Sequence, residues 1–356
     1  MDNRHHKAKG RAALSNATGR FEAVAREAVD DGWDLAEELP PLRTEVTEEV
    51  PRSIITRNTS PDVPFDRSIN PYRGCEHGCI YCFARPTHAY LGLSPGLDFE
   101  TRLIARPDAA TVLERELRRP SYRCATIAIG TNTDAYQPIE AERRIMRGIL
   151  EVLQAFRHPV GIATKGVLVG RDIDILGDMA GDGLAAVGIS VTTLDADLSR
   201  KMEPRVPTPL RRLRAVERLA AAGVPVRVMI SPIVPGLSDH EIEAIVAAAR
   251  DAGAAAATMI PLRLPLEVSE LWQSWLAEHY PDRVERVMSK LRDMHGGKPY
   301  DAAWGKRMTG EGIWANLLQQ RFKRAARAAG LDQKLPPLRT DLFEVPLAKG
   351  DQMALF

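Results

Sequence analysis

Three of the chain's four cysteines lie close together, in the stretch GCEHGCIYCFARP at residues 74–86. The spacing of Cys75, Cys79 and Cys82 is C-x3-C-x2-C, with glycines at positions 74 and 78. Three thiolates on one loop can bind a zinc ion or an iron–sulfur cluster. Glycine lets such a loop curl tightly around what it binds. The clustering therefore predicts a metal centre rather than three cysteines that pack as apolar side chains.

The two kinds of metal centre differ in what they need besides these cysteines. A structural zinc ion needs a fourth protein ligand, which His77 or Cys124 could supply. A [4Fe–4S] cluster held by three cysteines leaves one iron open, and an open metal position allows catalysis. Cys124 precedes the second predicted strand, whereas the cysteine loop follows the first. We therefore expect Cys124 to lie at the other end of the fold and to pack as a small hydrophobic residue.

Six short apolar stretches are the predicted strands that position this loop. They span residues 68–72, 125–130, 160–164, 185–192, 224–231 and 257–262. Each is apolar throughout, as parallel strands buried on both faces are. Amphipathic helical patterns lie between them, for example the stripe of Ile145, Ile149 and Leu153. Six such units, two short of a closed barrel, predict an α/β fold with a partial parallel (β/α)6 barrel.

The remaining segments divide the chain around this barrel. We predict an N-terminal extension at residues 1–66, the partial barrel at 67–265, a helical C-terminal region at 266–335 and a tail at 336–356. The loops that follow the strands form the functional face of a parallel barrel. The cysteine loop follows the first strand, so it lies on that face.

Composition suggests a cytoplasmic protein. No apolar run is long enough for a membrane helix, and the N-terminal MDNRHHKAKGR lacks the apolar core of a secretory signal. Net charge is only +1, but residues 283–330 carry eleven Lys and Arg against four acids. The basic helix predicted at 314–330 is compatible with contacts to nucleic-acid phosphates, and equally with a solvated surface.

The cysteine motif, with Tyr81 before the last cysteine, resembles the radical S-adenosylmethionine (SAM) superfamily over about residues 67–265. The resemblance implies a [4Fe–4S] cluster on Cys75, Cys79 and Cys82, with SAM bound at the open iron. It also implies reductive cleavage of SAM to a 5′-deoxyadenosyl radical, an electron donor such as flavodoxin or ferredoxin, and a partial (β/α)6 barrel.

Two stretches, INPYRGCEHGCIYCFAR and GTNTDAYQPIE, narrow the resemblance to the branch of spore photoproduct lyase and its DNA-repair-photolyase-like relatives. This branch implies nucleic-acid repair or modification. Spore photoproduct lyase carries an additional, hydrogen-donating cysteine after its second strand. Here the corresponding loop, residues 130–134, has none, which argues against activity on the spore lesion itself.

The resemblance also implies which residues bind SAM. Thr133 and Asp134 would contact the methionine amino group, and Gly130 would allow its close approach. Lys165 would bind the methionine carboxylate, as an ammonium group suits, and Ser190 the nucleoside. The predicted cofactor-binding residues are Tyr81, Gly130, Thr133, Asp134, Lys165 and Ser190. Residues 203–205 and 231–236 are expected to line the pocket.

The last five residues, QMALF, resemble the short motif by which bacterial repair and replication proteins bind the DNA sliding clamp. Gln352, Met353, Leu355 and Phe356 would make that contact. Two other functions stay open. One is a radical SAM enzyme that acts on a protein or a small molecule. The other is a zinc-binding structural or adaptor protein without radical chemistry.

Overall fold

A parallel sheet forms the centre of the computed structural model, which describes residues 9–25 and 42–347. Within these residues the sheet has seven strands in the order β10–β9–β8–β7–β6–β3–β2. They are β2 (Ile55–Arg57), β3 (Arg67–Ile69), β6 (Ile127–Ile129), β7 (Val160–Thr164), β8 (Ala185–Ser190), β9 (Val226–Ile233) and β10 (Ala256–Pro261). Strands β3 and β6 to β10 run parallel, and β2 joins the β3 edge antiparallel. The prediction of six parallel strands is confirmed.

The first strand is the one whose bounds differ most from the prediction. The stretch expected at 68–72 divides into β3 and β4 (Tyr72–Arg73), which belongs to a different sheet. Pro71 stands between them and has no N–H to donate to a strand ladder. The chain therefore leaves the barrel after Ile69 and passes through β4 before the cysteine loop begins at Gly74.

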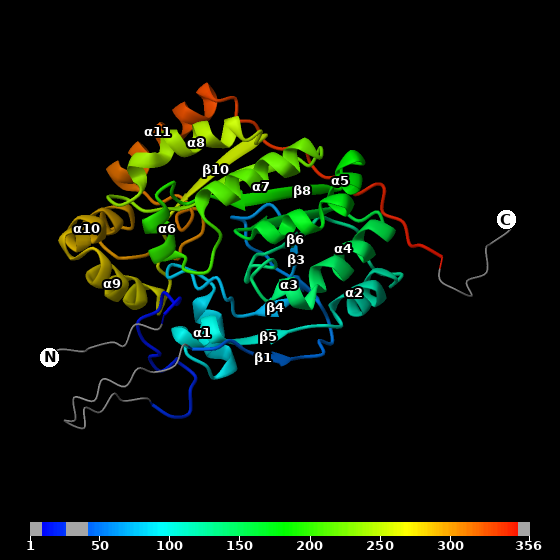
Figure 1. The fold of residues 1–356 in the computed structure, drawn as a ribbon, viewed down its shortest axis with the longest axis horizontal. Helices are drawn as coiled ribbons and strands as arrows, with labels where there is room; N and C mark the ends of the chain where they lie inside the picture. Colours follow the sequence, from blue (N-terminus) through cyan, green and yellow to red (C-terminus); the bar gives the residue numbers. More distant parts are fainter. Residues whose placement is uncertain (1–8, 26–41, 348–356) are drawn as a thin grey trace.

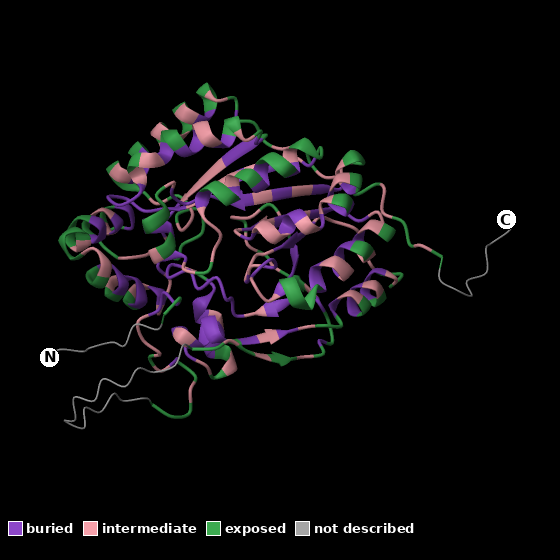
Figure 2. Cartoon of the chain, viewed as in Figure 1, coloured by how far each residue is buried: buried purple, intermediate pink, exposed green. Residues whose placement is uncertain are grey.

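Helices cover the outer face of the central sheet (Figure 1). They are α2 (Ala109–Leu117), α3 (Glu140–Arg143), α4 (Ile145–Ala155), α5 (Ile173–Gly181), α7 (Pro209–Ala221) and α8 (Ile242–Asp251), with 3₁₀ helices η2 (Val167–Arg171) and η3 (Asp239–Glu241). The short α6 (Ala196–Met202) instead packs against the cysteine loop and α9. The predicted stripe of α4 is buried at Ile145, Ile149 and Leu153. Figure 2 shows buried strands inside and exposed helix faces outside, as parallel α/β units require.

A second, smaller sheet lies below the barrel in Figure 1, in the order β1–β5–β4. It joins β1 (Glu45–Glu48) and β5 (Arg102–Ala105) in parallel, with β4 antiparallel to β5. The 3₁₀ helix η1 (Arg85–Leu91) and α1 (Leu97–Thr101) connect the cysteine loop to β5. The N-terminal extension thus adds β1 to this sheet and β2 to the barrel edge, which its weak periodicity did not indicate.

The predicted helical C-terminal region is confirmed. It contains α9 (Val268–His279), the 3₁₀ helix η4 (Pro281–Arg283), α10 (Val284–Met294) and α11 (Gly312–Ala328). Trp272 and Trp275 of α9 are fully buried and stack with ring centroids 5.0 Å apart. The outward Arg321 of α11 pairs with Glu243 of α8 at 2.6 Å, which ties this region to the barrel.

The stretch after α11 crosses the amino-terminal ends of the barrel strands. The backbone N–H of Arg339 donates to the carbonyl of Gly183, and that of Glu344 donates to the carbonyl of Phe156. Residues 348–356, with the four positions of the clamp-like motif, lie outside the described residues. In the described part of the chain, no helix is both long and apolar enough to cross a membrane.

Candidate active site

The cysteine loop is built from short turns, the first of which depends on glycine. The N–H of Gly78 donates to the carbonyl of Cys75, and the N–H of Cys82 donates to that of Cys79, both at 3.2 Å. Gly78 has a φ of +64°, and a Cβ there would lie 2.6 Å from a carboxylate oxygen of Glu100. Any side chain would therefore be strained and would also displace the loop from its support.

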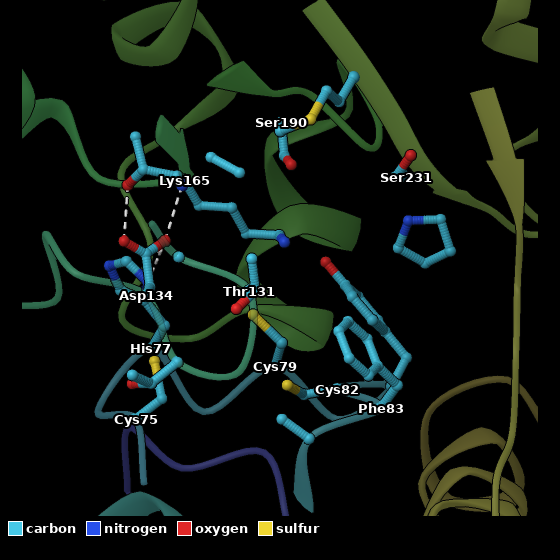
Figure 3. A pocket seen from close by; sticks show the side chains of 18 of the residues that line it. Cys75, His77, Cys79, Cys82, Phe83, Thr131, Asp134, Lys165, Ser190 and Ser231 are labelled. Carbon is cyan, nitrogen blue, oxygen red and sulfur yellow. Dashed lines mark hydrogen bonds and ion pairs between the residues drawn. The ribbon is translucent and has the colours of Figure 1, made fainter. Parts of the chain in front are cut away.

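The three cysteines line one pocket at the carboxyl ends of the strands (Figure 3). Each of the six predicted cofactor-binding residues also lines it: Tyr81, Gly130, Thr133, Asp134, Lys165 and Ser190. The space among the lining residues is about 1020 Å³, including its opening to solvent. Thiol, carboxylate, ammonium and hydroxyl groups thus face one shared space that opens to solvent.

The thiols fit a cluster better than a single ion. No group of three His, Cys, Asp or Glu side chains among the described residues is arranged to hold one metal ion. A [4Fe–4S] cluster needs no such convergence, because each thiolate binds a different iron. Burial raises the pKa of Cys75 and Cys79, so these thiols need a bound cation to ionise. The donor set therefore fits a cluster.

The fourth cysteine and the histidine considered for zinc take other roles. Cys124 lies before β6. Burial raises its pKa to about 11, although the nearby guanidinium of Arg67 acts in the opposite direction. It is not among the residues that line the pocket. His77 is buried, and its Nδ1 lies 3.2 Å from a carboxylate oxygen of Asp134.

Asp134 connects three parts of the site. Oδ1 accepts hydrogen bonds from the Thr164 hydroxyl at 2.6 Å and the Tyr136 N–H at 2.9 Å. Oδ2 accepts one from the Lys165 N–H at 2.7 Å and faces His77. Burial opposes its ionisation, but the His77 ring and these hydrogen bonds hold the pKa of Asp134 well below its usual range. Its lone pairs are taken, so here it positions the β7 end and the cysteine loop.

The neighbouring loop residues are also engaged with protein groups. The Thr133 hydroxyl donates to the carbonyl of Gly74 at 2.7 Å and accepts from the amide of Gln137. A Cβ at Gly130 would lie 1.9 Å from the carbonyl oxygen of Ala163, so glycine here serves the contact between β6 and β7. Thr133 and Asp134 both line the pocket, and their expected contact with the methionine amino group stays a prediction.

Lys165 presents a positively charged side chain to the pocket. Its side chain extends across the pocket in Figure 3, with Nζ 5.6 Å from the ring centroid of Tyr81. No carboxylate of the described residues lies within ion-pair distance of Nζ. Burial alone would lower the pKa of Lys165, but Cys79, Glu203 and Asp134 raise it, so the ammonium group stays charged. Ser190, at the end of β8, also faces this space, and no protein group accepts from its hydroxyl in the described part.

Glu203 lies behind the pocket and does not line it, which corrects the expectation for that residue. It is fully buried and accepts hydrogen bonds from Tyr81 and Thr192. Arg212 pairs with it at 2.7 Å, and both side chains are fully buried. Arg212 and Lys165 lower the pKa of Glu203 against the effect of burial. Glu203 therefore holds the Tyr81 ring beneath Lys165. Ser231 and Pro232 do line the pocket as expected.

Phe83 and Arg263 are among the pocket residues that the sequence did not indicate. Phe83 follows the last cysteine of the motif and is 47% exposed. Arg263 comes two residues after β10 ends, and its guanidinium carbon lies 4.7 Å from the Phe83 ring centroid. Its place after the last predicted strand was a signal that could have found it.

Comparison with known proteins agrees with this site. Residues 69–249, half of the chain, match the model of the radical SAM superfamily. The chain belongs to this superfamily. This radical SAM enzyme is 36% identical over 285 residues to uncharacterized proteins of Mycobacterium tuberculosis and Mycobacterium bovis, which covers 79% of this chain and 83% of theirs. It is 27% identical over 229 residues to an uncharacterized protein of Methanocaldococcus jannaschii, covering 62% and 79%.

Solved structures of spore photoproduct lyase share the fold. A substituted variant has a TM-score of 0.56 at 16% identity, and the match covers 80% of both chains. Another variant, with bound SAM and a dinucleoside spore photoproduct, has a TM-score of 0.54 at 15% identity and covers 80% of this chain and 79% of that one. The radical SAM superfamily implies a [4Fe–4S] cluster and SAM, and the residues described above fit both.

Proposed function

We propose that this radical SAM enzyme holds a [4Fe–4S] cluster on Cys75, Cys79 and Cys82 and uses it to cleave SAM reductively. The observation that carries the proposal is that three thiols share a pocket with the Lys165 ammonium group, which has no carboxylate partner among the described residues. When bound, the cluster supplies one electron to the sulfonium of SAM, whose C–S bond breaks to give methionine and a 5′-deoxyadenosyl radical that abstracts hydrogen from substrate.

The protein's own residues bind and orient the reactants. Lys165 binds the methionine carboxylate, because an unpaired buried ammonium gains most from an anion. Ser190 offers a hydroxyl to the nucleoside. Glu203, through Tyr81, and Asp134, through the Lys165 backbone, fix the position of that lysine. Such fixed geometry is what a short-lived reactive group needs.

The experiment is anaerobic reconstitution with iron and sulfide, followed by dithionite and SAM. The proposal expects about four irons per chain, with formation of 5′-deoxyadenosine and methionine. Cys79→Ala is the matched control and should form neither product. One zinc per chain and no 5′-deoxyadenosine in the wild-type protein would show an adaptor without radical chemistry.

We infer that the substrate is a nucleic acid. The support is the likeness of fold to spore photoproduct lyase, of which one structure holds a dinucleoside photoproduct. The basic residues between 283 and 330 add to it. Ultraviolet-damaged DNA, undamaged DNA and RNA should be compared as stimulants of 5′-deoxyadenosine formation. Stimulation by none of them, with uncoupled cleavage intact, would favour a protein or small-molecule substrate.

A further inference from the structure

Arg263 is a partly buried cation without an ion-pair partner among the described residues. In the described part of the chain, no carboxylate lies within ion-pair distance of it and no hydrogen bond satisfies its guanidinium. Tyr300, Cys82 and Asp62 favour its charge, but Asp62 already binds Arg307 at 2.5 Å and the N–H of Gly305 at 2.8 Å. Arg85 and Arg212, which are fully buried, each pair with a glutamate. Desolvating a guanidinium without such a partner is unfavourable, so Arg263 is arranged for an external anion.

Phe83 supplies a flat surface beside this cation. Its ring is 47% exposed although it lines the pocket, and the Arg263 guanidinium lies over it, 4.7 Å from the centroid. An accessible aromatic ring beside a cation offers a flat surface on which a nucleic-acid base can stack. The residue follows Cys82 directly, so a group that stacks on Phe83 lies next to the site of chemistry.

A second arginine and aromatic ring are associated with the same region. Arg307 lies 4.7 Å over the ring of Trp304, which is 53% exposed, and it is near enough to Arg263 for the two charges to repel. Trp304 and Arg307 belong to the loop between α10 and α11. Asp62 of the N-terminal extension accepts hydrogen bonds from Gly305 and Arg307 of this loop. Alternating guanidinium groups and exposed rings are typical of surfaces that bind single nucleic-acid strands.

A polar group without a hydrogen-bond partner lies on the same side of the pocket as Arg263. The Ser231 hydroxyl is buried and has no hydrogen-bond partner, and it belongs to β9, which pairs with β10. Figure 3 shows it across the pocket from Asp134 and His77. The half of the pocket under β9 and β10 thus has unsatisfied groups of its own, separate from Lys165.

We propose that Arg263 and Phe83 form the substrate subsite, in which Arg263 binds a backbone phosphate and Phe83 stacks on the adjacent base of a nucleic-acid strand. This rests on the nucleic-acid substrate proposed above and names the residues that receive it. A guanidinium matches a phosphate with two parallel hydrogen bonds. The phosphate and base together account for both the unpaired cation and the uncovered ring.

The test is anaerobic binding of a short, fluorescein-labelled single-stranded DNA to the reconstituted protein, followed by anisotropy over a range of salt. Arg263→Gln should lose affinity by about tenfold or more, and its salt slope should fall by about 0.7. Arg263→Lys should lose less, because it keeps the charge without the fork. Phe83→Leu should lose about fivefold to a hundredfold, because base stacking is lost. Iron content should stay at the wild-type level in all three.

The matched control is Arg119→Gln, which removes the same charge from an exposed residue that follows α2, outside the basic residues 283–330. Equal loss in this control, or unchanged affinity in Arg263→Gln and Phe83→Leu, would overturn the subsite. Inorganic phosphate that displaces the DNA as well as unlabelled DNA does would overturn the nucleotide assignment. So would an Arg263→Gln protein that binds SAM weakly but DNA normally.

The wild-type protein's own formation of 5′-deoxyadenosine, measured on the same preparation, reports on SAM cleavage independently. If it cleaves SAM and responds to damaged DNA while the variants bind like wild type, the subsite fails alone. Wild-type protein that binds no DNA at low salt would overturn the subsite and the nucleic-acid substrate together, and leave SAM cleavage standing.

Discussion

Arg85 and Glu100 form a fully buried ion pair directly against the cysteine loop, with 2.5 Å between Nη2 and Oε1. The remaining N–H groups of Arg85 donate to carbonyl oxygens that include those of Gly78 and Cys79. The Glu100 carboxylate also accepts from the backbone N–H groups of Ala12 and Ala13. The pair therefore fastens the cluster-binding loop to the N-terminal extension.

Replacing Glu100 by Gln should release iron from the reconstituted protein and destabilise the fold. Removing one partner of a buried ion pair typically costs about 3–5 kcal/mol. Iron per chain after gel filtration and the free energy of unfolding measure the two effects. The control, Glu267→Gln, breaks the more exposed pair with Arg20 and should cost at most about 1 kcal/mol. Equal effects of the two changes would contradict a supporting role for Glu100.

Replacing Cys75, Cys79 or Cys82 by Ala should in each case abolish cluster assembly and SAM cleavage. Cys124→Ala should leave both intact, because that thiol stands outside the pocket. Iron and sulfide content together with 5′-deoxyadenosine formation measure the outcome. Loss of the cluster in Cys124→Ala would indicate a fourth protein ligand.

Lys165→Ala should weaken SAM binding while the iron content stays unchanged. Its ammonium group is charged and lacks a carboxylate partner, so a bound methionine carboxylate would be its counter-ion. Losing one charge-assisted hydrogen bond costs on the order of 1.5–3 kcal/mol. Calorimetry of SAM binding to the reconstituted protein measures this loss. Unchanged affinity would show that Lys165 does not bind the methionine carboxylate.

His158 should make folding stability depend on pH. Its Nδ1–H donates to the carbonyl of Pro159, and its Nε2 accepts from the Tyr122 hydroxyl at 2.7 Å, so the ring is neutral. Burial lowers the pKa of His158 from 6.5 to about 4, and the charge of Arg67 acts in the same direction. The unfolded chain thus binds the proton more tightly, and stability falls as pH drops from about 6.5 to about 4.

The loss assigned to His158 is on the order of 3 kcal/mol. His158→Gln keeps a donor and an acceptor but does not titrate, so its free energy of unfolding should fall less over this range. Burial also lowers the pKa of His88 to about 4, so part of the pH dependence should remain in the variant. Denaturant unfolding at several pH values measures the slopes, and identical slopes would contradict the assignment.

Deleting residues 352–356 should remove binding to a bacterial sliding clamp and leave cluster content unchanged. Leu355 and Phe356 would be the apolar anchors of that contact, and Gln352 would set its register. A pull-down with the full-length and shortened proteins measures it. Absence of clamp binding by the full-length protein would end this proposal.

The sequence alone determined the features that depend on neighbouring residues. The spacing of Cys75, Cys79 and Cys82 predicted a metal centre because ligand reach within one loop is local. The apolar stretches predicted six parallel strands, because burial on both faces leaves a continuous apolar run. The order of strands and loops then placed the cysteines at the functional end of the barrel.

Only the tertiary structure decided which polar groups have partners. Arg85 forms an ion pair with Glu100, and Asp134 accepts a hydrogen bond from Thr164. Arg263 has no ion-pair partner among the described residues. Nothing in the residues that flank these side chains distinguishes the three cases. Glu241 is another side chain whose partners the sequence does not indicate. Its carboxylate accepts hydrogen bonds from the Thr193 hydroxyl and from the N–H of Leu194, 47 positions away. Such pairs form because folding removes water from groups distant in sequence, and each must then find whatever partner the fold brings near.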